Sequence, residues 1–277
     1  MKRLTDLLTP EARVTVLTGA GVSAASGVPT FRSAGGLWRN FRPEALATAE
    51  AFGRDPGLVW EWYAWRRSVI AACEPNEAHR VLAGWALRFP NFKLITQNVD
   101  GLHESAFSEA SAGSASDEAS ARSAFAKASA RRAVAASGVI RLHGSIWEVS
   151  CWQRCPTSPR HWRDDTLSFT ELPPRCRYCS GIIRPAVVWF GETLEPDVVS
   201  QASHAAKCDI FITIGTSAVV YPAASFMDEA RKHGAFTVEI NPEATPATPV
   251  VDLVLQGGAE MILPEIDKQI RARRPVV

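Results

Sequence analysis

A β-branched apolar run that leads straight into a glycine-rich turn restricts this chain most strongly, because the combination is typical of an α/β fold. Residues 14–17 read VTVL, as expected for a strand buried on both faces of a parallel sheet. Gly19, Gly21 and Ala24 follow in the spacing G-x-G-x-x-A. The first glycine permits a tight turn, the second lets backbone N–H groups approach a pyrophosphate, and the small alanine lets the next helix pack closely. The segment is a candidate dinucleotide site, with a plain strand-to-helix connection as the alternative.

Three further apolar runs also end in small or polar residues. They are residues 92–95 before TQNVDGLH at 96–103, residues 139–142 before His143-Gly144, and residues 209–214 before Gly215-Thr216-Ser217. The carboxyl ends of parallel strands meet at one edge of a sheet, where open α/β sheets bind their ligands. We therefore expect these polar side chains to gather near the glycine-rich turn.

Composition limits the class of protein and its partners. At 277 residues, 46% of them hydrophobic, the chain is long enough for one large core and a small appended module. A net charge of +1 gives no reason to expect a nucleic-acid partner, and no apolar run is long enough to span a bilayer. Asp6 and Pro10 interrupt the short apolar stretch that a signal peptide would need. We expect a cytoplasmic protein without a nucleic-acid or membrane partner.

Four of the six cysteines form two close pairs with residues 156–175 between them. The pairs are Cys151 with Cys155 and Cys176 with Cys179. This pattern resembles a four-thiolate zinc ribbon of a reducing compartment, and four thiolates leave the metal no open position. The zinc is therefore predicted to be structural, with disulfides or unpaired buried thiols as the alternative. Cys73 and Cys208 are interpreted as small core residues.

Taken in order, these motifs resemble the sirtuins (the Sir2 family), which are NAD-dependent protein-lysine deacylases. The resemblance runs across nearly the whole chain. The matching segments are GAGVSAASGVPTFR at 19–32, TQNVDGLH at 96–103, LHG at 142–144, four cysteines within 151–179, VVWFGE at 187–192, GTS at 215–217, and Ile240-Asn241. One departure is the first cysteine pair, which reads C-x-x-x-C where C-x-x-C is usual, so the first knuckle gains a residue.

The resemblance implies a Rossmann-like, doubly wound parallel sheet and a second, smaller helical and zinc-ribbon domain. We predict the NAD-binding domain at 1–32, 76–147 and 181–277, the small domain at 33–75 and 148–180, and the active cleft between them. Residues 105–138 are dominated by Ala and Ser where the family has a short connection. We interpret them as a mobile or marginally helical insertion, tolerated at a surface loop, with partner binding as the alternative.

The resemblance also assigns the chemistry. In sirtuins the acyl-lysine carbonyl oxygen attacks the nicotinamide ribose carbon as nicotinamide leaves. His143 is the predicted base, because the ordinary pKa of histidine lies near neutrality. Asn98 is expected to hold the ribose or a water, Asp100 to bind the nicotinamide carboxamide region, and Gln97 to contact ribose. From the residues alone, Asn98 and Asp100 favour a turn with Gly101, and a core histidine is the alternative for His143.

The cofactor contacts come from the glycine-bearing loops. Phe31 is expected to shield the reactive carbon after nicotinamide departs, and Arg32 to contact phosphate or order the loop, a surface cation being its alternative. Ser23 faces the diphosphate in this prediction, and Ser217 and Asn241 bind the adenosine side. The full predicted set is Gly19, Ala20, Gly21, Ser23, Ala24, Phe31, Arg32, Gln97, Asn98, Asp100, Gly215, Thr216, Ser217 and Asn241.

Substrate recognition is predicted at two places. Tyr63 and Arg66 lie three apart on one helix face, where a phenol and a guanidinium can jointly bind a carboxylate. The pair resembles the Tyr-x-x-Arg signature of sirtuins that remove succinyl and malonyl groups. A strand-like segment is expected to pair with the substrate backbone, and a core strand is the alternative for Val187 and Val188. This segment comprises Val188, Trp189, Phe190, Gly191 and Glu192.

The resulting prediction is an enzyme that removes succinyl or malonyl groups, and also acetyl groups, from protein lysines. NAD is consumed, and nicotinamide, free lysine and O-acyl-ADP-ribose are released. We expect a monomer. The alternatives are an acetyl-only deacetylase, an ADP-ribosyltransferase or NAD hydrolase, and a non-catalytic NAD-sensing module. Tyr63 and Arg66 argue against ADP-ribosyl transfer, and His143, Asn98 and Asp100 argue against a non-catalytic role.

Overall fold

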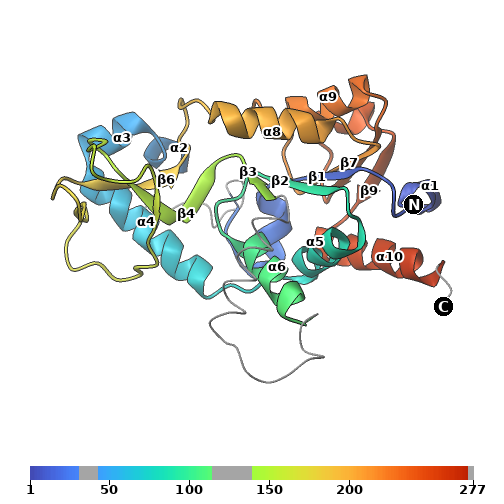
Figure 1. The fold of residues 1–277 in the computed structure, drawn as a ribbon, viewed down its shortest axis with the longest axis horizontal. Coiled ribbons are helices and arrows are strands. Elements are labelled where there is room, and N and C mark those ends of the chain that lie inside the picture. The colour runs from blue at the N-terminus through green and yellow to red at the C-terminus, as the bar shows by residue number, and fades with distance from the viewer. Residues whose placement is uncertain (31–42, 114–138, 274–277) are drawn as a thin grey trace.

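The structure is a computed structural model that describes residues 1–30, 43–113 and 139–273. Phe31, Arg32 and residues 114–138 of the predicted insertion lie outside the described part. Figure 1 shows a larger unit, built on a sheet between helices, beside a smaller unit that contains α2, α3, α4, β4 and β6. Within the described residues, no helix combines the length and apolar character needed to cross a membrane.

The larger unit is built on a six-stranded parallel sheet with the strand order β3-β2-β1-β7-β8-β9. Its strands are β1 (Val14–Thr18), β2 (Phe92–Thr96), β3 (Val139–Arg141), β7 (Ile210–Ile214), β8 (Phe236–Asn241) and β9 (Leu253–Gln256). Val14 pairs with Phe92 of β2 on one side and with Ile210 of β7 on the other. The chain builds outward from β1 in one direction and then, from β7, in the other, so the strand order reverses between β1 and β7. This is the doubly wound, Rossmann-like order, and the predicted fold class is confirmed.

Helices cover both faces of this sheet. One layer contains α5 (Glu77–Arg88), α6 (Leu102–Gly113) and α10 (Ala259–Ala272), and the opposite layer contains α8 (Pro196–Ala206) and α9 (Ser225–Lys232) (Figure 1). Val16 packs in the core under the first layer and Leu17 in the core under the second. Because both faces are covered, β1 and β7 are buried at every residue, which explains why apolar side chains and threonine are their only residues.

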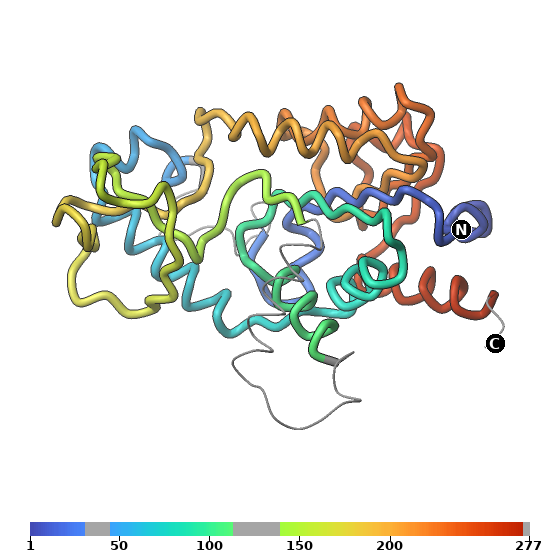
Figure 2. The backbone as a smooth tube through the Cα atoms, viewed as in Figure 1, coloured from blue at the N-terminus to red at the C-terminus, as the bar shows by residue number. Residues whose placement is uncertain are grey.

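The two ends of the larger unit meet. Helix α1 (Lys2–Leu7) contacts α10, and the two segments lie near each other in the backbone trace (Figure 2). Asp6 forms an ion pair with Arg273, which directly follows α10. A short 3-10 helix, η3 (Thr248–Val250), precedes β9. The first helix and the last described helix therefore belong to the same unit.

The smaller unit has its own antiparallel sheet, with the order β5-β4-β6. Its elements are α2 (Pro43–Leu46), α3 (Ala49–Arg54), α4 (Pro56–Ala71), β4 (Gly144–Cys151), β5 (Trp162–Arg163) and β6 (Ile183–Val187). Asp55 begins α4 by accepting the Leu58 N–H at 2.9 Å, and Pro56 occupies the first turn, where its missing N–H costs nothing. Phe52, Trp60 and Trp189 are buried in this unit's core.

The small sheet extends beyond the residues predicted for the small domain. β4 begins at Gly144 and β6 lies after residue 181, although the sequence assigned 144–147 and 181–187 to the larger domain. The two strands pair with each other, and neither joins the parallel sheet. The exact division into domains remains a prediction.

The beginning of the predicted insertion is an ordered helix. Helix α6 includes residues 105–113, and its Ala106 and Phe107 are buried in the core shared with α5. Residues 105–113 are therefore helical, as one of the two interpretations expects, and these two apolar side chains pack the helix against its neighbour.

Candidate active site

The glycine-rich turn leaves β1 and enters a seven-residue 3-10 helix, η1 (Ala20–Ser26), which Gly27 ends in a left-handed conformation (φ 90°). Val22 is the residue of η1 that packs into the core. Ala24 is exposed, so its interpretation as the residue that brings the helix close to the strand was wrong.

Glycine is required at this turn because two loops touch through their backbones. The Gly21 N–H donates to the Gly215 carbonyl at 2.8 Å. A Cβ on Gly21 would lie 2.7 Å from the Gly215 Cα, and a Cβ on Gly215 (φ 58°) would lie 2.5 Å from the Val22 nitrogen. No side chain fits in either place. The loops after β1 and β7 are thereby held together at the point where the strand order reverses.

A cavity of about 320 Å³ opens beside this contact. Gly21, Ala24 and Gly215 line it, as the prediction of a shared cofactor site requires. The complete lining is Gly21, Ala24, Ala25, Gly215, Ile240, Pro242, Gly258, Ala259 and Glu260. The start of α10 forms one side of the cavity, and none of its residues belongs to the predicted cofactor-binding set. The cavity lies outside the carboxyl ends of β1, β7 and β8, where a doubly wound sheet binds its ligand.

The remaining predicted adenosine-side residues surround this region. Thr216 and Ser217 are half-buried in the loop after β7. Asn241, at the end of β8, donates from Nδ2 to the Thr216 carbonyl at 3.2 Å. Gln97 donates from Nε2 to Thr216 Oγ1 at 2.9 Å, so the loop after β2 reaches the same place.

A buried polar network ties the residues after β2 to the glycine-rich turn. Ser23 Oγ donates to Asp100 Oδ2 at 2.9 Å, and Asn98 Nδ2 donates to the Ser23 oxygen at 3.2 Å and to the Gly19 carbonyl at 3.1 Å. Asp100 Oδ1 also accepts the Leu102 N–H at 2.9 Å, beside a left-handed Gly101. The turn that the residues favour on their own is therefore present, and it is what aims Asp100 at Ser23.

Burial has the largest effect on the pKa of the Asp100 carboxyl. Burial raises its pKa, while hydrogen bonds from Leu102 and Ser23 and the charge of Arg66 oppose the rise without cancelling it. Arg66, in α4, is thus close enough for its charge to act on a residue of the network. A charge of the smaller unit therefore acts on a carboxylate of the larger unit.

His79 completes the network and was missed by the sequence analysis. Its Nδ1 accepts the Asn76 N–H at 3.2 Å, so in the neutral ring Nε2 carries the hydrogen and donates to Ser23 Oγ at 3.3 Å. Burial lowers the pKa of His79 to about 4, which keeps the ring neutral at pH 7. The available signal was the capping-box position of His79 three residues after Asn76, at the start of α5.

His143 follows β3 and is held in one tautomer. Its Nδ1 lies 3.0 Å from the Gln97 carbonyl oxygen, which can only accept, so Nδ1 carries the hydrogen and Nε2 keeps its lone pair. Burial lowers the pKa of His143, and the hydrogen bond to Gln97 opposes this only in part. The ring is accordingly neutral at pH 7 and can accept a proton at Nε2.

Tyr63 and Arg66 lie together on α4, as their spacing predicts. Tyr63 is 1% exposed, and its phenol oxygen accepts the Trp189 indole N–H at 2.8 Å. The Arg66 guanidinium carbon lies 5.0 Å from the Trp62 ring centroid and 5.9 Å from that of Tyr63. Burial raises the pKa of Tyr63 and lowers that of Arg66, because both charged forms are desolvated.

The segment after β6 is a rim and not a continuation of the strand. Val187 ends β6 in the core, and Phe190 is 45% exposed. The Val188 N–H donates to the His143 carbonyl, and the Phe190 N–H to the Ala47 carbonyl. Those N–H groups are therefore used within the chain. The predicted substrate-binding residue Trp189 is buried, and its indole faces Tyr63.

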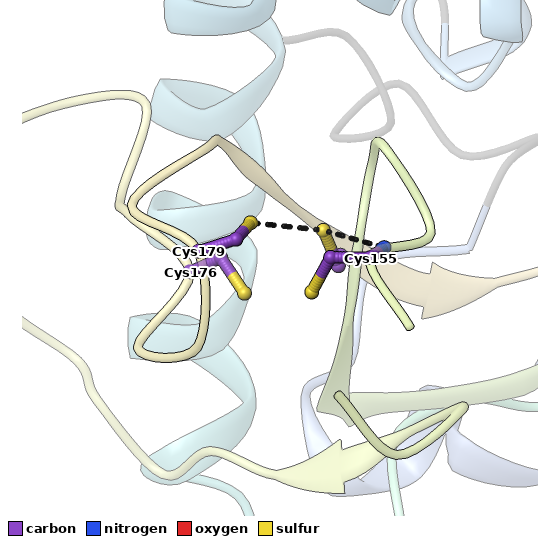
Figure 3. Close-up of side chains that lie close together, drawn as sticks. Cys155, Cys176 and Cys179 are labelled. Atoms are coloured by element: carbon purple, nitrogen blue, oxygen red, sulfur yellow. Dashed lines mark hydrogen bonds between the residues drawn. The ribbon is translucent and has the colours of Figure 1, made fainter. Parts of the chain in front are cut away.

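The four cysteines of the small unit converge, and Figure 3 labels three of them. The sulfur atoms of Cys151, Cys155, Cys176 and Cys179 all lie within 4.8 Å of one another, and the cysteines are free. Zinc bound tetrahedrally at about 2.3 Å from each sulfur requires sulfurs roughly 3.8 Å apart, so the donor set fits one structural zinc. The disulfide alternative is wrong. The extra residue of the first knuckle is accommodated by Arg154, which is left-handed (φ 51°) and donates its N–H to the Cys151 carbonyl.

Strand order, switch-point cavity and thiolate cluster together define a Rossmann-like nucleotide-binding protein with a zinc module. The Sir2 family model matches residues 19–115 and 130–222, and the omitted residues 116–129 fall within the Ala/Ser-rich segment. The NAD-dependent protein deacylase of Aquifex aeolicus is 43% identical, over 94% of this chain and 96% of its own. The chain belongs to the Sir2 family.

Two solved structures extend the similarity to three dimensions. A Sir2 homologue in complex with NAD superposes with a TM-score of 0.79 at 37% identity, over 98% of this chain and 94% of its own. A Sir2 variant solved with a deacetylated p53 peptide and 3'-O-acetyl ADP ribose has a TM-score of 0.71 at 26% identity, over 97% and 98%.

Proposed function

We propose that this protein is an NAD-dependent protein-lysine deacylase with a preference for acyl groups that end in a carboxylate. NAD, an acylated lysine and one water are consumed, and nicotinamide, free lysine and O-acyl-ADP-ribose are formed. The deacylase activity is supported by the names of relatives that match almost the whole chain. The acyl preference is supported by the paired phenol and guanidinium on α4.

The cavity and the polar network are proposed to bind different halves of NAD. The cavity bounded by Gly215, Ile240 and Gly258 suits the adenosine half, with the diphosphate at the glycine-rich turn. The ionisable side chains of the network lie on the other side, after β2 and β3, so the nicotinamide half belongs near Asn98 and Asp100. When bound, NAD supplies an electrophilic ribose carbon and nicotinamide as a leaving group.

His143 then acts as the general base. The observation that carries this role is its hydrogen bond to the Gln97 carbonyl, which commits Nδ1 and leaves Nε2 to take a proton from a ribose hydroxyl. Ser23 and His79 keep Asp100 and Asn98 in place. Zinc, with four thiolate ligands, contributes to the fold of the small unit and not to the reaction.

An acyl carboxylate is the feature by which Tyr63 and Arg66 would recognise their substrate. A phenol O–H and a guanidinium N–H can each donate to one carboxylate, and the burial of Tyr63 together with the half-burial of Arg66 strengthens both hydrogen bonds. Acetyl-lysine offers no such partner. We therefore place succinyl- and malonyl-lysine ahead of acetyl-lysine.

We further propose that the protein acts as a monomer in the cytoplasm. The four free cysteines of the zinc cluster are compatible with a reducing compartment, which keeps thiolates available to the metal.

The test is NAD-dependent deacylation of matched acetyl-lysine and succinyl-lysine peptides by the wild type, Arg66→Met and His143→Ala. We expect the wild type to prefer the succinyl peptide, Arg66→Met to lose that preference, and His143→Ala to lose both activities. Transfer of radiolabel from NAD to protein in place of deacylation would contradict the proposal and indicate an ADP-ribosyltransferase. NAD binding by zinc-loaded wild type without nicotinamide release would instead indicate a sensing module.

A further inference from the structure

Trp189 makes a buried hydrogen bond that the proposed chemistry does not use. Its indole N–H donates to the Tyr63 phenol oxygen at 2.8 Å, and both side chains are almost fully buried. Tyr63 belongs to α4, whereas Trp189 follows β6. The bond therefore joins the acyl-recognition helix to the predicted substrate-binding rim.

This hydrogen bond leaves the Tyr63 hydroxyl free to act as a hydrogen-bond donor. A tyrosine hydroxyl can donate one hydrogen and accept through its oxygen, and Trp189, which can only donate, occupies the accepting side. Among the described residues, the Tyr63 O–H donates no hydrogen bond. A buried donor without an acceptor is costly, so its presence here points to an acceptor on a ligand. Arg66 beside it favours an anionic acceptor.

Trp189 is itself held firmly. The Arg184 guanidinium carbon lies 3.5 Å from the centroid of its indole ring. Arg184 binds both carboxylate oxygens of Glu192, at 2.5 and 2.9 Å, and Glu192 in turn accepts the Trp189 backbone N–H at 2.8 Å. The indole is thus fixed at its backbone and across its face, and it cannot turn away from Tyr63 without breaking this clamp.

We propose that Trp189 is a positioning residue for acyl specificity, which orients the Tyr63 hydroxyl as a donor toward a substrate carboxylate. The inference rests on the proposed acyl preference and deepens it. Trp189 does not touch the acyl group in this account. It removes the alternative in which Tyr63 turns its oxygen lone pair toward the carboxylate and repels it.

The test compares Trp189→Phe with wild type by kcat/KM for succinyl-lysine and acetyl-lysine peptides. Phenylalanine keeps an aromatic ring and removes the N–H. We expect the succinyl-to-acetyl ratio to fall about tenfold, with the loss in KM for the succinyl peptide, since a hydrogen bond to a charged group is worth about that factor or more. Trp152→Phe is the matched control, because Trp152 packs 6.3 Å from the Trp189 ring and is expected to leave the ratio unchanged.

A second pair of variants separates positioning from general damage. If Trp189 acts through the Tyr63 hydroxyl, adding Trp189→Phe to Tyr63→Phe lowers the ratio no further. An unchanged ratio in Trp189→Phe, or equal losses in the presence and absence of the Tyr63 hydroxyl, would overturn the inference while leaving the acyl preference of the wild type intact. A wild type that prefers acetyl-lysine would overturn the acyl preference and, with it, the inference.

Discussion

The parallel sheet and the cysteine module are stabilised by different interactions. In the larger unit, β1 and β7 are buried at every position, and two apolar cores lie on the two faces of the sheet. The stretch from Cys151 to Cys179 contains little regular structure beyond β5, and its fixed feature is a cluster of four sulfurs. Apolar burial supports the first region and metal coordination the second, so the two should fail under different conditions.

The proposed general base lies where the larger and smaller units join. β3 ends in the parallel sheet at Arg141, β4 begins in the small sheet at Gly144, and His143 stands on the connection. A Cβ on Gly144 (φ 76°) would lie 2.1 Å from the Ala186 carbonyl oxygen of β6. His143, the proposed base, is therefore positioned by both units, and damage to either unit is expected to affect it.

The largest effect is expected from breaking the metal cluster. Cys176→Ser removes a buried thiolate, and because structural zinc contributes on the order of 10 kcal/mol to folding, we expect loss of zinc, opening of residues 151–179 and loss of deacylation. Zinc content and limited proteolysis report the change, and the far-UV spectrum of the larger unit should persist. Cys208→Ala, in the core of the larger unit, is the control that should retain zinc. Full zinc content in Cys176→Ser would contradict the proposal that metal coordination supports the cysteine module.

The converse experiment damages the larger unit alone. Gly215→Ala forces a Cβ to within 2.5 Å of the Val22 nitrogen at a left-handed position, and we expect NAD affinity to fall at least tenfold while zinc is retained. Titration calorimetry with NAD measures this. Gly53→Ala is the control, since nothing lies within 4 Å of the added carbon. Unaltered NAD affinity would mean that the contact between the two loops does not shape the site.

Acid should act first on the residue at the junction. Burial lowers the pKa of His143, and a general base works only in its neutral form, so kcat/KM falls as pH drops through that lowered value. We expect the midpoint of the acid limb below the ordinary histidine value of about 6.5. The pH profile is measured together with zinc content, because protonated thiols also release zinc. A midpoint above 6.5 at constant zinc content would contradict the assignment.

The smallest effect is expected at an ion pair remote from the site. Asp267 of α10 accepts from the Trp85 indole at 3.0 Å and from Arg88 at 2.6 Å. Asp267→Asn weakens these charged hydrogen bonds, and we expect the free energy of unfolding to fall by about 1–3 kcal/mol. Urea denaturation measures this loss, and zinc content and NAD affinity should not change. Glu265→Gln, exposed on the same helix, is the control and should be nearly neutral.

Short-range features of the active site were predictable because each rests on neighbouring residues. The strand before Gly19, the polar residues after β2 and the spacing of Tyr63 and Arg66 all follow from local periodicity. His79 was not predictable in this way. Its partner Ser23 is 56 residues distant, and the two meet only because α5 packs beside η1.

The sequence by itself determined the doubly wound class of the sheet, the four metal ligands and the loops that carry polar chemistry, because apolar runs, glycine spacing and cysteine spacing act over a few residues. The tertiary structure alone decided how distant segments meet: the backbone contact of Gly21 with Gly215, the bond from Trp189 to Tyr63, and the wall that α10 adds to the cavity. Such contacts depend on strand register and helix packing, which no local pattern encodes.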